Sequence, residues 1–269
     1  MQDLKKAPIG IFDSGIGGLT VAKAVIDALP NEDIIYFGDT ARVPYGIKSE
    51  ATVRAYALEI TRFLLNKGVK MILIACNTVS ASAKKEIIQA AGTVPVLDVI
   101  TSGTGTAVGL PDHENIGVIG TLGTVNSRAY VESIHAFDKA IKVNQQACPL
   151  LVPLAEEGWI ENDIAIQTLH HYLDHFDDSG IQTLILGCTH YPLFKKAINQ
   201  VLKNKNIRIV DSAESIAFSA RQKLADMDLL NTKGGNFQCF VSDRPQRFHE
   251  LAERFLGRQL KGVEVVTLD

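Results

Sequence analysis

The chain lacks the features that would place it in a membrane or a secretory route. None of its apolar runs approaches the length that spans a bilayer. Its opening, MQDLKKAPIG, has no apolar segment of the kind found in a secretory signal. The formal net charge is only −3, which gives no electrostatic reason to expect a nucleic acid or an anionic membrane as partner. We therefore expect a cytoplasmic protein without such partners.

Cysteine is scarce, and no C-x-x-C pair is present. The four cysteines, Cys76, Cys148, Cys188 and Cys239, are far apart, which argues against a zinc knuckle or a thioredoxin-type motif, so no metal is expected. In a reducing cytosol each should be a free thiol, either a buried small apolar residue or a reactive group. The glycine-rich DSGIGG, from Asp13, lacks the Gly-Lys-Ser/Thr of a phosphate loop and the third glycine of a dinucleotide fingerprint.

The apolar pattern predicts an α/β protein. At 269 residues and 46% hydrophobic content, the chain has enough material for one large domain or two of ordinary size. Residues 49–68 show helical periodicity. Short β-branched runs predict buried parallel strands wrapped by helices, at 8–13, 33–39, 70–76, 94–100, 115–120, 141–147, 181–188, 207–212, 237–242 and 263–268.

Two stretches of the chain resemble each other. IGIFDSGIGG begins at Ile9 and IGVIGTLGTV at Ile116, and each is followed at a similar distance by an apolar run that ends in a cysteine, ILIACNT and LILGCTH. We interpret this as two similar doubly wound halves related by pseudo-symmetry. Boundaries are expected near residues 98 and 210, and periodicity leaves open which half the last segment completes.

Polar residues gather where these strands end. In open α/β sheets ligands bind at the carboxyl ends of strands. Asp13, Cys76 and Cys188 all lie at such ends, so two facing halves would offer one thiol each to a ligand in the cleft between them. Racemisation at a Cα needs a base on one face and an acid on the other, and a thiol with an ordinary pKa of roughly 8.5 suits both roles.

Each of these residues also has a purely structural interpretation. Asp13 and Ser14 would cap a helix beginning near Gly17, His190 would be a core histidine, and a cysteine is among the most frequently buried residue types. The segment PYG, from Pro44, would be only a turn.

With these motifs assembled, the sequence resembles the glutamate racemases of the aspartate/glutamate racemase superfamily. FDSGIGGLTV, GDTARVPYG, ACNT, GVIGTLGT, CPLLVPLAEEG and LGCTHYP occur in that family's order and spacing. The resemblance implies two α/β domains, 1–98 plus 211–269 and 99–210, with the active site between them. It also implies glutamate as substrate, no cofactor, supply of D-glutamate for peptidoglycan and, in many members, a homodimer.

The resemblance also assigns roles to residues. Cys76 would take the proton from D-glutamate with help from Asp13, and Cys188 from L-glutamate with help from His190 and Glu156, although the adjacent Glu157 leaves the register open. Asp39 matches a family acid of secondary role, and Cys148, in a strand-like stretch, and Cys239 match no catalytic position. Substrate contacts would come from Asp13, Ser14, Tyr45, Gly46, Asn77, Thr78, Thr189 and His190.

The sequence differs from the family pattern at one segment, and three other protein classes are weighed against this interpretation. Thr101-Ser102-Gly103 stands where many members have Glu-Pro-Gly, at the expected domain crossover, which bears on the hinge more than on catalysis. An aspartate racemase would continue its second motif with Glu rather than His190. A binding protein of this architecture would need no polar partners for its cysteines. A pyridoxal phosphate racemase would need a Schiff-base lysine and a phosphate cup, and neither stands out.

Overall fold

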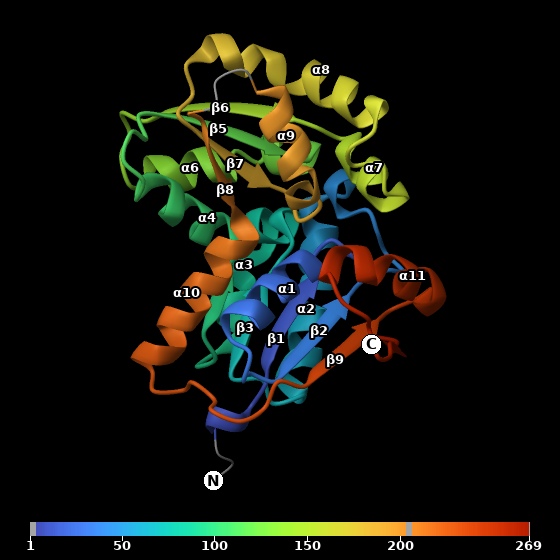
Figure 1. Cartoon of the computed structure of the whole chain (residues 1–269). Coiled ribbons are helices and arrows are strands. Elements are labelled where there is room, and N and C mark those ends of the chain that lie inside the picture. Colours follow the sequence, from blue (N-terminus) through green and yellow to red (C-terminus); the bar gives the residue numbers. More distant parts are fainter. Residues whose placement is uncertain (1–3, 203–205, 269) are drawn as a thin grey trace.

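The computed structural model describes residues 4–202 and 206–268, which form two parallel sheets, one above the other in Figure 1. Within these residues the larger sheet has the order β10-β9-β2-β1-β3-β4 and the smaller β6-β5-β7-β8. The strands are β1 Ile9–Asp13, β2 Ile34–Gly38, β3 Met71–Ile74, β4 Val96–Asp98, β5 Asn115–Gly120, β6 Lys142–Ala147, β7 Thr183–Gly187, β8 Arg208–Asp211, β9 Phe237–Val241 and β10 Glu264–Val265. Each lies inside a strand range predicted from the sequence.

The two sheets share one topology. The order β2-β1-β3-β4 in one corresponds to β6-β5-β7-β8 in the other, and β9 and β10 extend the larger sheet beyond β2. The predicted α/β class with two similar parallel-sheet halves is therefore confirmed. The larger sheet takes its strands from both ends of the chain and the smaller from its middle. The domain limits at 98/99 and 210/211 remain a prediction.

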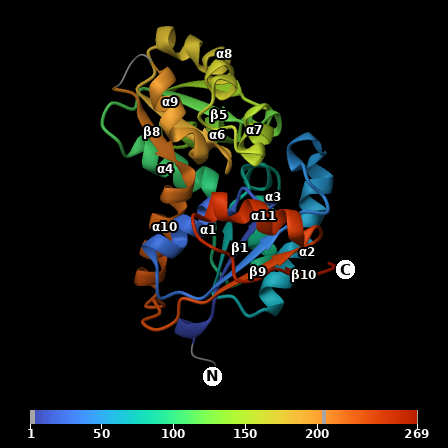
Figure 2. The ribbon, with the colours of Figure 1, turned by 45° about the vertical axis from the view of Figure 1, so that its right-hand side comes forward.

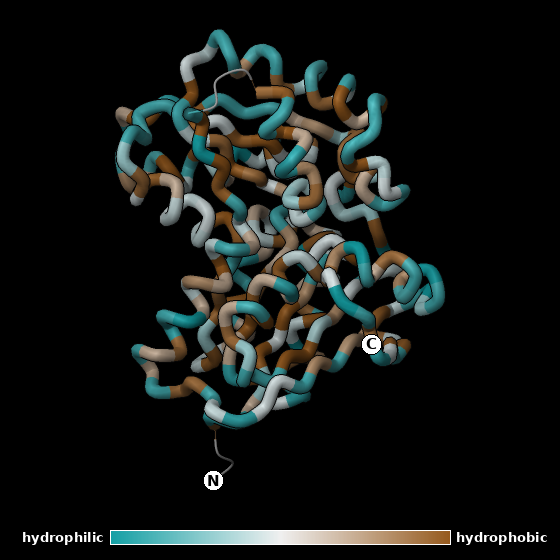
Figure 3. Tube along the Cα trace, in the orientation of Figure 1, coloured by the Kyte–Doolittle hydropathy of each residue, from teal (hydrophilic) through white to brown (hydrophobic). Residues whose placement is uncertain are grey.

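Helices cover both sheets, and the apolar strands lie inside. Figure 3 shows hydrophobic segments running through the interior of both halves. Among the described residues, no helix has the length and apolar character needed to cross a bilayer. The helices are α1 Leu19–Ala28, α2 Glu50–Asn66, α3 Asn77–Ala91, α4 Val99–Val108, α5 Leu122–Asn126, α6 Ala129–His135, α7 Leu151–Glu157, α8 Asp163–Ser179, α9 Lys195–Val201, α10 Ser212–Asp226 and α11 Pro245–Leu256, with 3₁₀ turns η1 Leu4–Lys6, η2 Tyr45–Ile47 and η3 Tyr191–Phe194.

Helix α2 shows how the sequence pattern produces these elements. Ser49 caps it by accepting a hydrogen bond from the backbone N–H of Thr52. Its buried face repeats at helical spacing (Val53, Ala57, Ile60 and Leu64), and Gly68 follows its end with a φ of +73°. The sequence-based helix is confirmed here.

One local expectation was wrong. The stretch around Cys148, interpreted as strand-like, leads into helix α7. Pro153 is the third residue of that helix, where the missing proline N–H leaves no helical hydrogen bond unmade. Gly158 ends the helix with a φ of +78°. A short apolar run with two prolines does not show helical periodicity, which is why the pattern misled.

The chain passes from the larger sheet to the smaller through α4 and returns through α10. Asp98 caps α4 by accepting from the N–H of Thr101, and Asp211 caps α10 by accepting from that of Ala213. Both capping carboxylates are ion-paired over 2.7 Å, Asp98 with Lys84 and Asp211 with Lys195. The two crossovers therefore start with the same arrangement.

The departure at residues 101–103 lies in the first turn of α4, against the second crossover. A Cβ on Gly103 would be 3.4 Å from the Cβ of Ser212, the first residue of α10. That distance is an ordinary van der Waals contact, so α4 packs directly against the start of α10 here. This segment therefore belongs to the contact between the crossovers.

Candidate functional site

Cys76 and Cys188 occupy equivalent positions in the two sheets. Cys76 follows β3 and is the N-cap of α3, while Cys188 follows the corresponding strand β7 directly. Both are free thiols, and each is 5% exposed. The 3₁₀ turn η3, with Pro192 in its first positions, follows Cys188 and leads into α9.

Contacts between the halves bring the surroundings of the two cysteines together. The Thr20 hydroxyl donates to the carbonyl of Thr189 over 2.9 Å. The Tyr130 hydroxyl donates to Oδ1 of Asn77, the residue after Cys76, over 2.8 Å. A Cβ on Gly17 would lie 2.5 Å from the His190 ring, so glycine is required there for the halves to approach. These contacts place Asn77, Thr189 and His190, which lie next to the two cysteines in the chain, where the two halves meet.

Cys76 lies beside the turn after β1. Its Sγ is 3.5 Å from Oγ of Ser14. Burial, and then the negative charge of Asp13, raise the pKa of the Cys76 thiol to about 12. Without a ligand this sulfur is therefore a protonated thiol, able to donate a proton.

Asp13 does not cap helix α1, which begins at Leu19 with no side-chain cap. Its Oδ2 accepts a hydrogen bond from the N–H of Gly15 over 2.9 Å. Burial raises the pKa of Asp13, and the positive charge of His190 opposes that shift. Within residues 4–202 and 206–268, Oδ1 of Asp13 and Nδ2 of Asn77 are buried without hydrogen-bond partners. A bound molecule would find one acceptor and one donor here.

Cys188 faces a histidine that is held from behind by a carboxylate. Sγ of Cys188 lies 3.9 Å from Nδ1 of His190, and Nε2 of His190 lies 3.3 Å from Oε1 of Glu156. Burial favours the neutral ring, but the hydrogen bonds to Cys188 and Glu156 outweigh it and raise the pKa of His190 to about 10. The hydrogen bond from His190 lowers the pKa of Glu156. An imidazolium therefore faces the sulfur at neutral pH.

The structure shows which of the two adjacent glutamates, Glu156 or Glu157, contacts His190. Glu157 pairs with Arg247 over 3.4 Å. Glu156 is the residue whose carboxylate reaches His190. Sequence alone left this open because both residues lie in the last turn of α7.

Helix α11, from the larger-sheet half, lies beneath α7 in Figure 2. It contacts the segment that carries Glu156 and the ring of His190. Arg254 donates to the carbonyls of Ala155 and Glu156 over 3.2 and 2.6 Å. The ring of Phe255 stands edge-on to His190, with centroids 5.3 Å apart. No sequence motif pointed to these residues, because α11 lies about 90 residues beyond Glu156 and contacts it only through the fold.

Tyr45 is buried, but its hydroxyl is already engaged. It donates to Oδ2 of Asp39, whose carboxylate also accepts from Arg42 and Ser242 over 2.7 Å each. A contact between Tyr45 and a substrate would therefore come from its backbone. A Cβ on the neighbouring Gly46 would be 3.4 Å from the Thr121 side chain, which places this turn against the smaller-sheet half. Thr78 and Thr189 are buried, at 7% and 5% exposure.

A cavity of about 370 Å³ borders the site. It is lined in part by Gly15, Thr40, Glu156, Arg244 and Arg247, so it touches the turn after Asp13 and the carboxylate behind His190. Its lining thus carries charges of both signs, the Glu156 carboxylate and two arginines, of which Arg247 pairs with Glu157 and Arg244 with Asp243.

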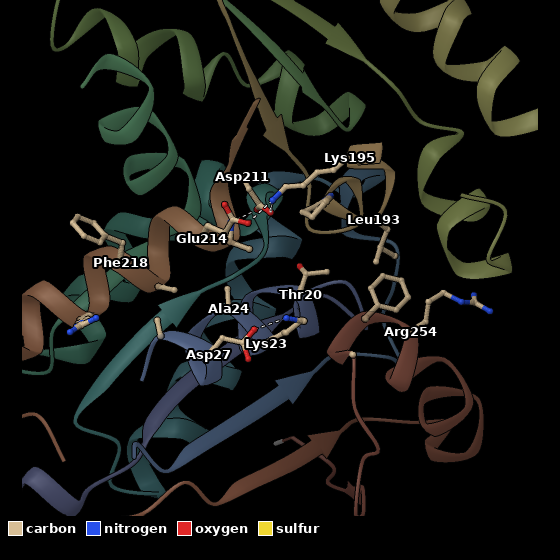
Figure 4. A pocket seen from close by; sticks show the side chains of 17 residues that line it. Thr20, Lys23, Ala24, Asp27, Leu193, Lys195, Asp211, Glu214, Phe218 and Arg254 are labelled. Atoms are coloured by element: carbon tan, nitrogen blue, oxygen red, sulfur yellow. Dashed lines mark hydrogen bonds and ion pairs between the residues drawn. The ribbon is translucent and has the colours of Figure 1, made fainter. Parts of the chain in front are cut away.

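A larger cavity, of about 650 Å³, lies elsewhere, between α1, α10, η3 and α11 (Figure 4). Several of its charged groups pair with one another, Lys23 with Asp27 over 2.5 Å and Lys195 with both Asp211 and Glu214. Neither Cys76 nor Cys188 lines it. No group of three or more potential metal-ligating His, Cys, Asp or Glu residues occurs in the described part of the chain.

Comparison with known proteins relates this arrangement to a family. Residues 17–220 match the family described as Asp/Glu/Hydantoin racemase. The chain is 47% identical to the glutamate racemase of Neisseria meningitidis over 98% of both chains.

Solved structures show the same relationship. A glutamate racemase from Francisella tularensis in complex with D-glutamate superimposes with a TM-score of 0.92 at 42% identity, over 98% of this chain and 99% of that one. A Thermus thermophilus glutamate racemase in complex with β-chloro-D-alanine gives 0.88 at 44% identity, over 98% of each chain.

Proposed function

Since the chain belongs to the Asp/Glu/hydantoin racemase family, as an isomerase of its glutamate racemase group, we propose that it interconverts L-glutamate and D-glutamate by a two-base mechanism without a cofactor. The observation that carries the mechanism is the pair of buried cysteines at equivalent strand ends, each beside a polar partner of its own. Two such thiols supply both proton transfers, so no electron sink or metal ion is required.

Substrate binding would use polar groups from both halves. Nδ2 of Asn77 and the hydroxyls of Ser14, Thr78 and Thr189 are donors for carboxylates, and the N-terminus of α3 favours a negative charge beside Cys76. Oδ1 of Asp13 is an acceptor for the substrate ammonium group. Closure of the two halves would hold the substrate in a buried, low-dielectric space, where each of these interactions is strengthened.

In the L-to-D direction, Cys188 as thiolate takes the α-proton of L-glutamate. The electron pair of that C–H bond remains on Cα and spreads into the α-carboxylate. The thiol of Cys76 then gives its proton to the opposite face of Cα, which forms D-glutamate. In the reverse direction the two sulfurs exchange roles, and the enzyme ends each turnover with the protons on the other cysteine.

The charges at the site suit the L-to-D direction in particular. Cys76 has a raised pKa and carries its proton, as an acid must. His190 is positively charged and faces Cys188, where it stabilises a thiolate, and Glu156 stabilises His190 in turn. Asp13 stands beside Cys76 as the matching assistant for the reverse reaction.

The proposal includes a biological role. A bacterial cell uses D-glutamate in peptidoglycan, and we propose that this enzyme supplies it in the cytoplasm, as a homodimer.

Circular dichroism tests the activity directly. Purified protein is dialysed against EDTA and mixed with L-glutamate, D-glutamate or L-aspartate, without added cofactor. We expect the ellipticity of both glutamate enantiomers to decay to zero. A matched control is Cys239→Ala, which removes another buried thiol and should keep the activity. Decay only after addition of pyridoxal phosphate or a metal would contradict cofactor independence, and binding of glutamate without any decay would show a binding protein.

A further inference from the structure

Tyr130 links the two halves beside both cysteines, although no sequence motif singled it out. It lies in α6 and is fully buried. Its hydroxyl donates over 2.8 Å to Oδ1 of Asn77, which follows Cys76 in the other half. On its other side, a Cβ on Gly187 would lie 2.9 Å from Cε2 of the Tyr130 ring. The same side chain therefore contacts the residue after one cysteine and the residue before the other.

The Asn77 amide is only half used by the protein. Its Oδ1 accepts from Tyr130, whereas its Nδ2, buried in the described structure, has no partner there. Because the amide group is planar, fixing Oδ1 also fixes the direction of both Nδ2 hydrogens. A buried donor without a partner carries a desolvation cost that a bound acceptor would offset.

We propose that Tyr130 is a positioning residue for the racemase reaction, whose hydroxyl holds the Asn77 amide so that Nδ2 stays directed to a substrate carboxylate. The inference rests on the proposed function. Tyr130 touches no reacting atom and acts through Asn77. Because its own anchor is in α6 of the smaller-sheet half, the amide is aligned only when the two halves are together, and the alignment is lost when they separate.

The surroundings of Tyr130 keep it in the donor form. Burial first, and then the charges of Asp98, Cys188 and Asp211, raise the pKa of its phenol, while the nearby Ser212 hydroxyl opposes the shift. The phenol therefore keeps its proton at every pH at which the enzyme works, and a protonated phenol gives its hydrogen to the amide oxygen. Asp98 and Asp211 are also the caps of the two crossover helices, so the tyrosine lies where those helices begin.

The substitution Tyr130→Phe removes only the hydroxyl. Asn77 can then rotate, and the substrate carboxylate loses an aligned donor. We expect KM for both glutamate enantiomers to rise about tenfold, with kcat reduced much less, because the carboxylate is bound both before and during the proton transfers. Tyr172→Phe is the matched control, since Tyr172 is another buried tyrosine of the same half, and its hydroxyl accepts a hydrogen bond from the N–H of Leu150 rather than holding Asn77. That variant should keep the wild-type KM.

A double-mutant cycle with Asn77→Ala separates positioning from a general loss of structure. If Tyr130 acts through Asn77, Tyr130→Phe adds nothing to KM once Asn77 is alanine. Thermal unfolding of all variants shows whether each is folded at the assay temperature. Independent, multiplicative effects of the two substitutions on KM, or an unchanged KM in Tyr130→Phe, would overturn the inference. A wild-type protein that does not racemise glutamate would instead refute the proposed function, so the two failures are distinct.

Discussion

His190 lies so close to Gly17 that no side chain fits between them. A Cβ at Gly17 would be 2.5 Å from Cε1 and Nδ1 of His190, and 2.3 Å from Oγ1 of Thr189. Gly17 belongs to the turn before α1 in the larger-sheet half, and His190 follows Cys188 in the other. The fit of one glycine against one imidazole therefore sets how closely the halves approach at the site.

Gly17→Ala should reduce catalysis without unfolding the protein. The added methyl group forces Thr189 and His190 away, which breaks the alignment of His190 with Cys188. We expect kcat/KM to fall about 100-fold or more, since a displacement of about 1 Å at a site has an effect of that size. The control is Gly105→Ala in α4, where a Cβ would meet nothing within 4 Å. Equal kcat/KM values for Gly17→Ala and Gly105→Ala would show that the contact between Gly17 and His190 does not align the site.

The two cysteines should divide the enantiomers between them. Cys76→Ser and Cys188→Ser each leave one competent base, so each should lose racemisation by a factor on the order of 10³. A glutamate analogue that eliminates a leaving group after α-deprotonation needs only one base. Cys76→Ser should process its L-form through Cys188, and Cys188→Ser its D-form through Cys76.

The measurement is product formation from each enantiomer of the analogue, together with deuterium incorporation into glutamate in deuterated water. Cys239→Ala serves as the control with an unaltered site. Loss of the same enantiomer in both variants would show that the cysteines do not face each other across the substrate.

The charge on His190 predicts a pH dependence. Its folded pKa of about 10 lies above its unfolded value of about 6.5, so its contribution to stability is complete below about pH 6.5 and is lost as the pH rises through about 10. We expect kcat/KM for L-glutamate to decline over the upper part of this interval, when the imidazolium beside Cys188 is lost.

Glu156→Gln should move this basic limb to lower pH by about one unit, because the carboxylate that supports the imidazolium is gone. Glu157→Gln is the control, since Glu157 pairs with Arg247 instead. The test is the pH profile of kcat/KM for both variants. If the basic limb of kcat/KM falls at the same pH in the wild type and in Glu156→Gln, then Glu156 does not stabilise the imidazolium of His190.

Aspartate should be a poor substrate. Donors from both halves would hold two carboxylates at the separation found in glutamate, and shortening the side chain by one methylene leaves buried donors unpaired. We expect kcat/KM for aspartate to be lower by a factor on the order of 10³ or more. Circular dichroism measures both reactions. Comparable kcat/KM values for aspartate and glutamate would assign the chain to the aspartate racemases.

The parts of the fold and site that the sequence predicted are those encoded locally. Strands buried on both faces have continuous apolar runs, and a polar residue directly after such a run marks a strand end. Asp13, Cys76 and Cys188 were found this way, and the structure places all three in buried surroundings that the two halves share.

The missed residues depend on tertiary distance. Tyr130, Arg254 and Phe255 lie in helices whose sequence pattern shows only that one face is buried. Which partner each meets follows from how the two halves pack, and no single helix contains that information. Helix α7 was missed for a different reason, because its seven residues, with Pro153 among them and Pro149 just before, are too few to establish a helical period.

The strand order also governs what happens while the chain is being made. Strand β2 lies between β1 and β9, and β9 is synthesised roughly 200 residues after it, which at about 5–20 residues per second takes on the order of 10–40 s. During that time the apolar edge Ile34–Gly38 lies open on the nascent polypeptide, while the intervening β5–β8 can already assemble. An unpaired edge of this kind attracts other chains. Nascent chains released before Phe237 should therefore aggregate more readily than the full-length chain.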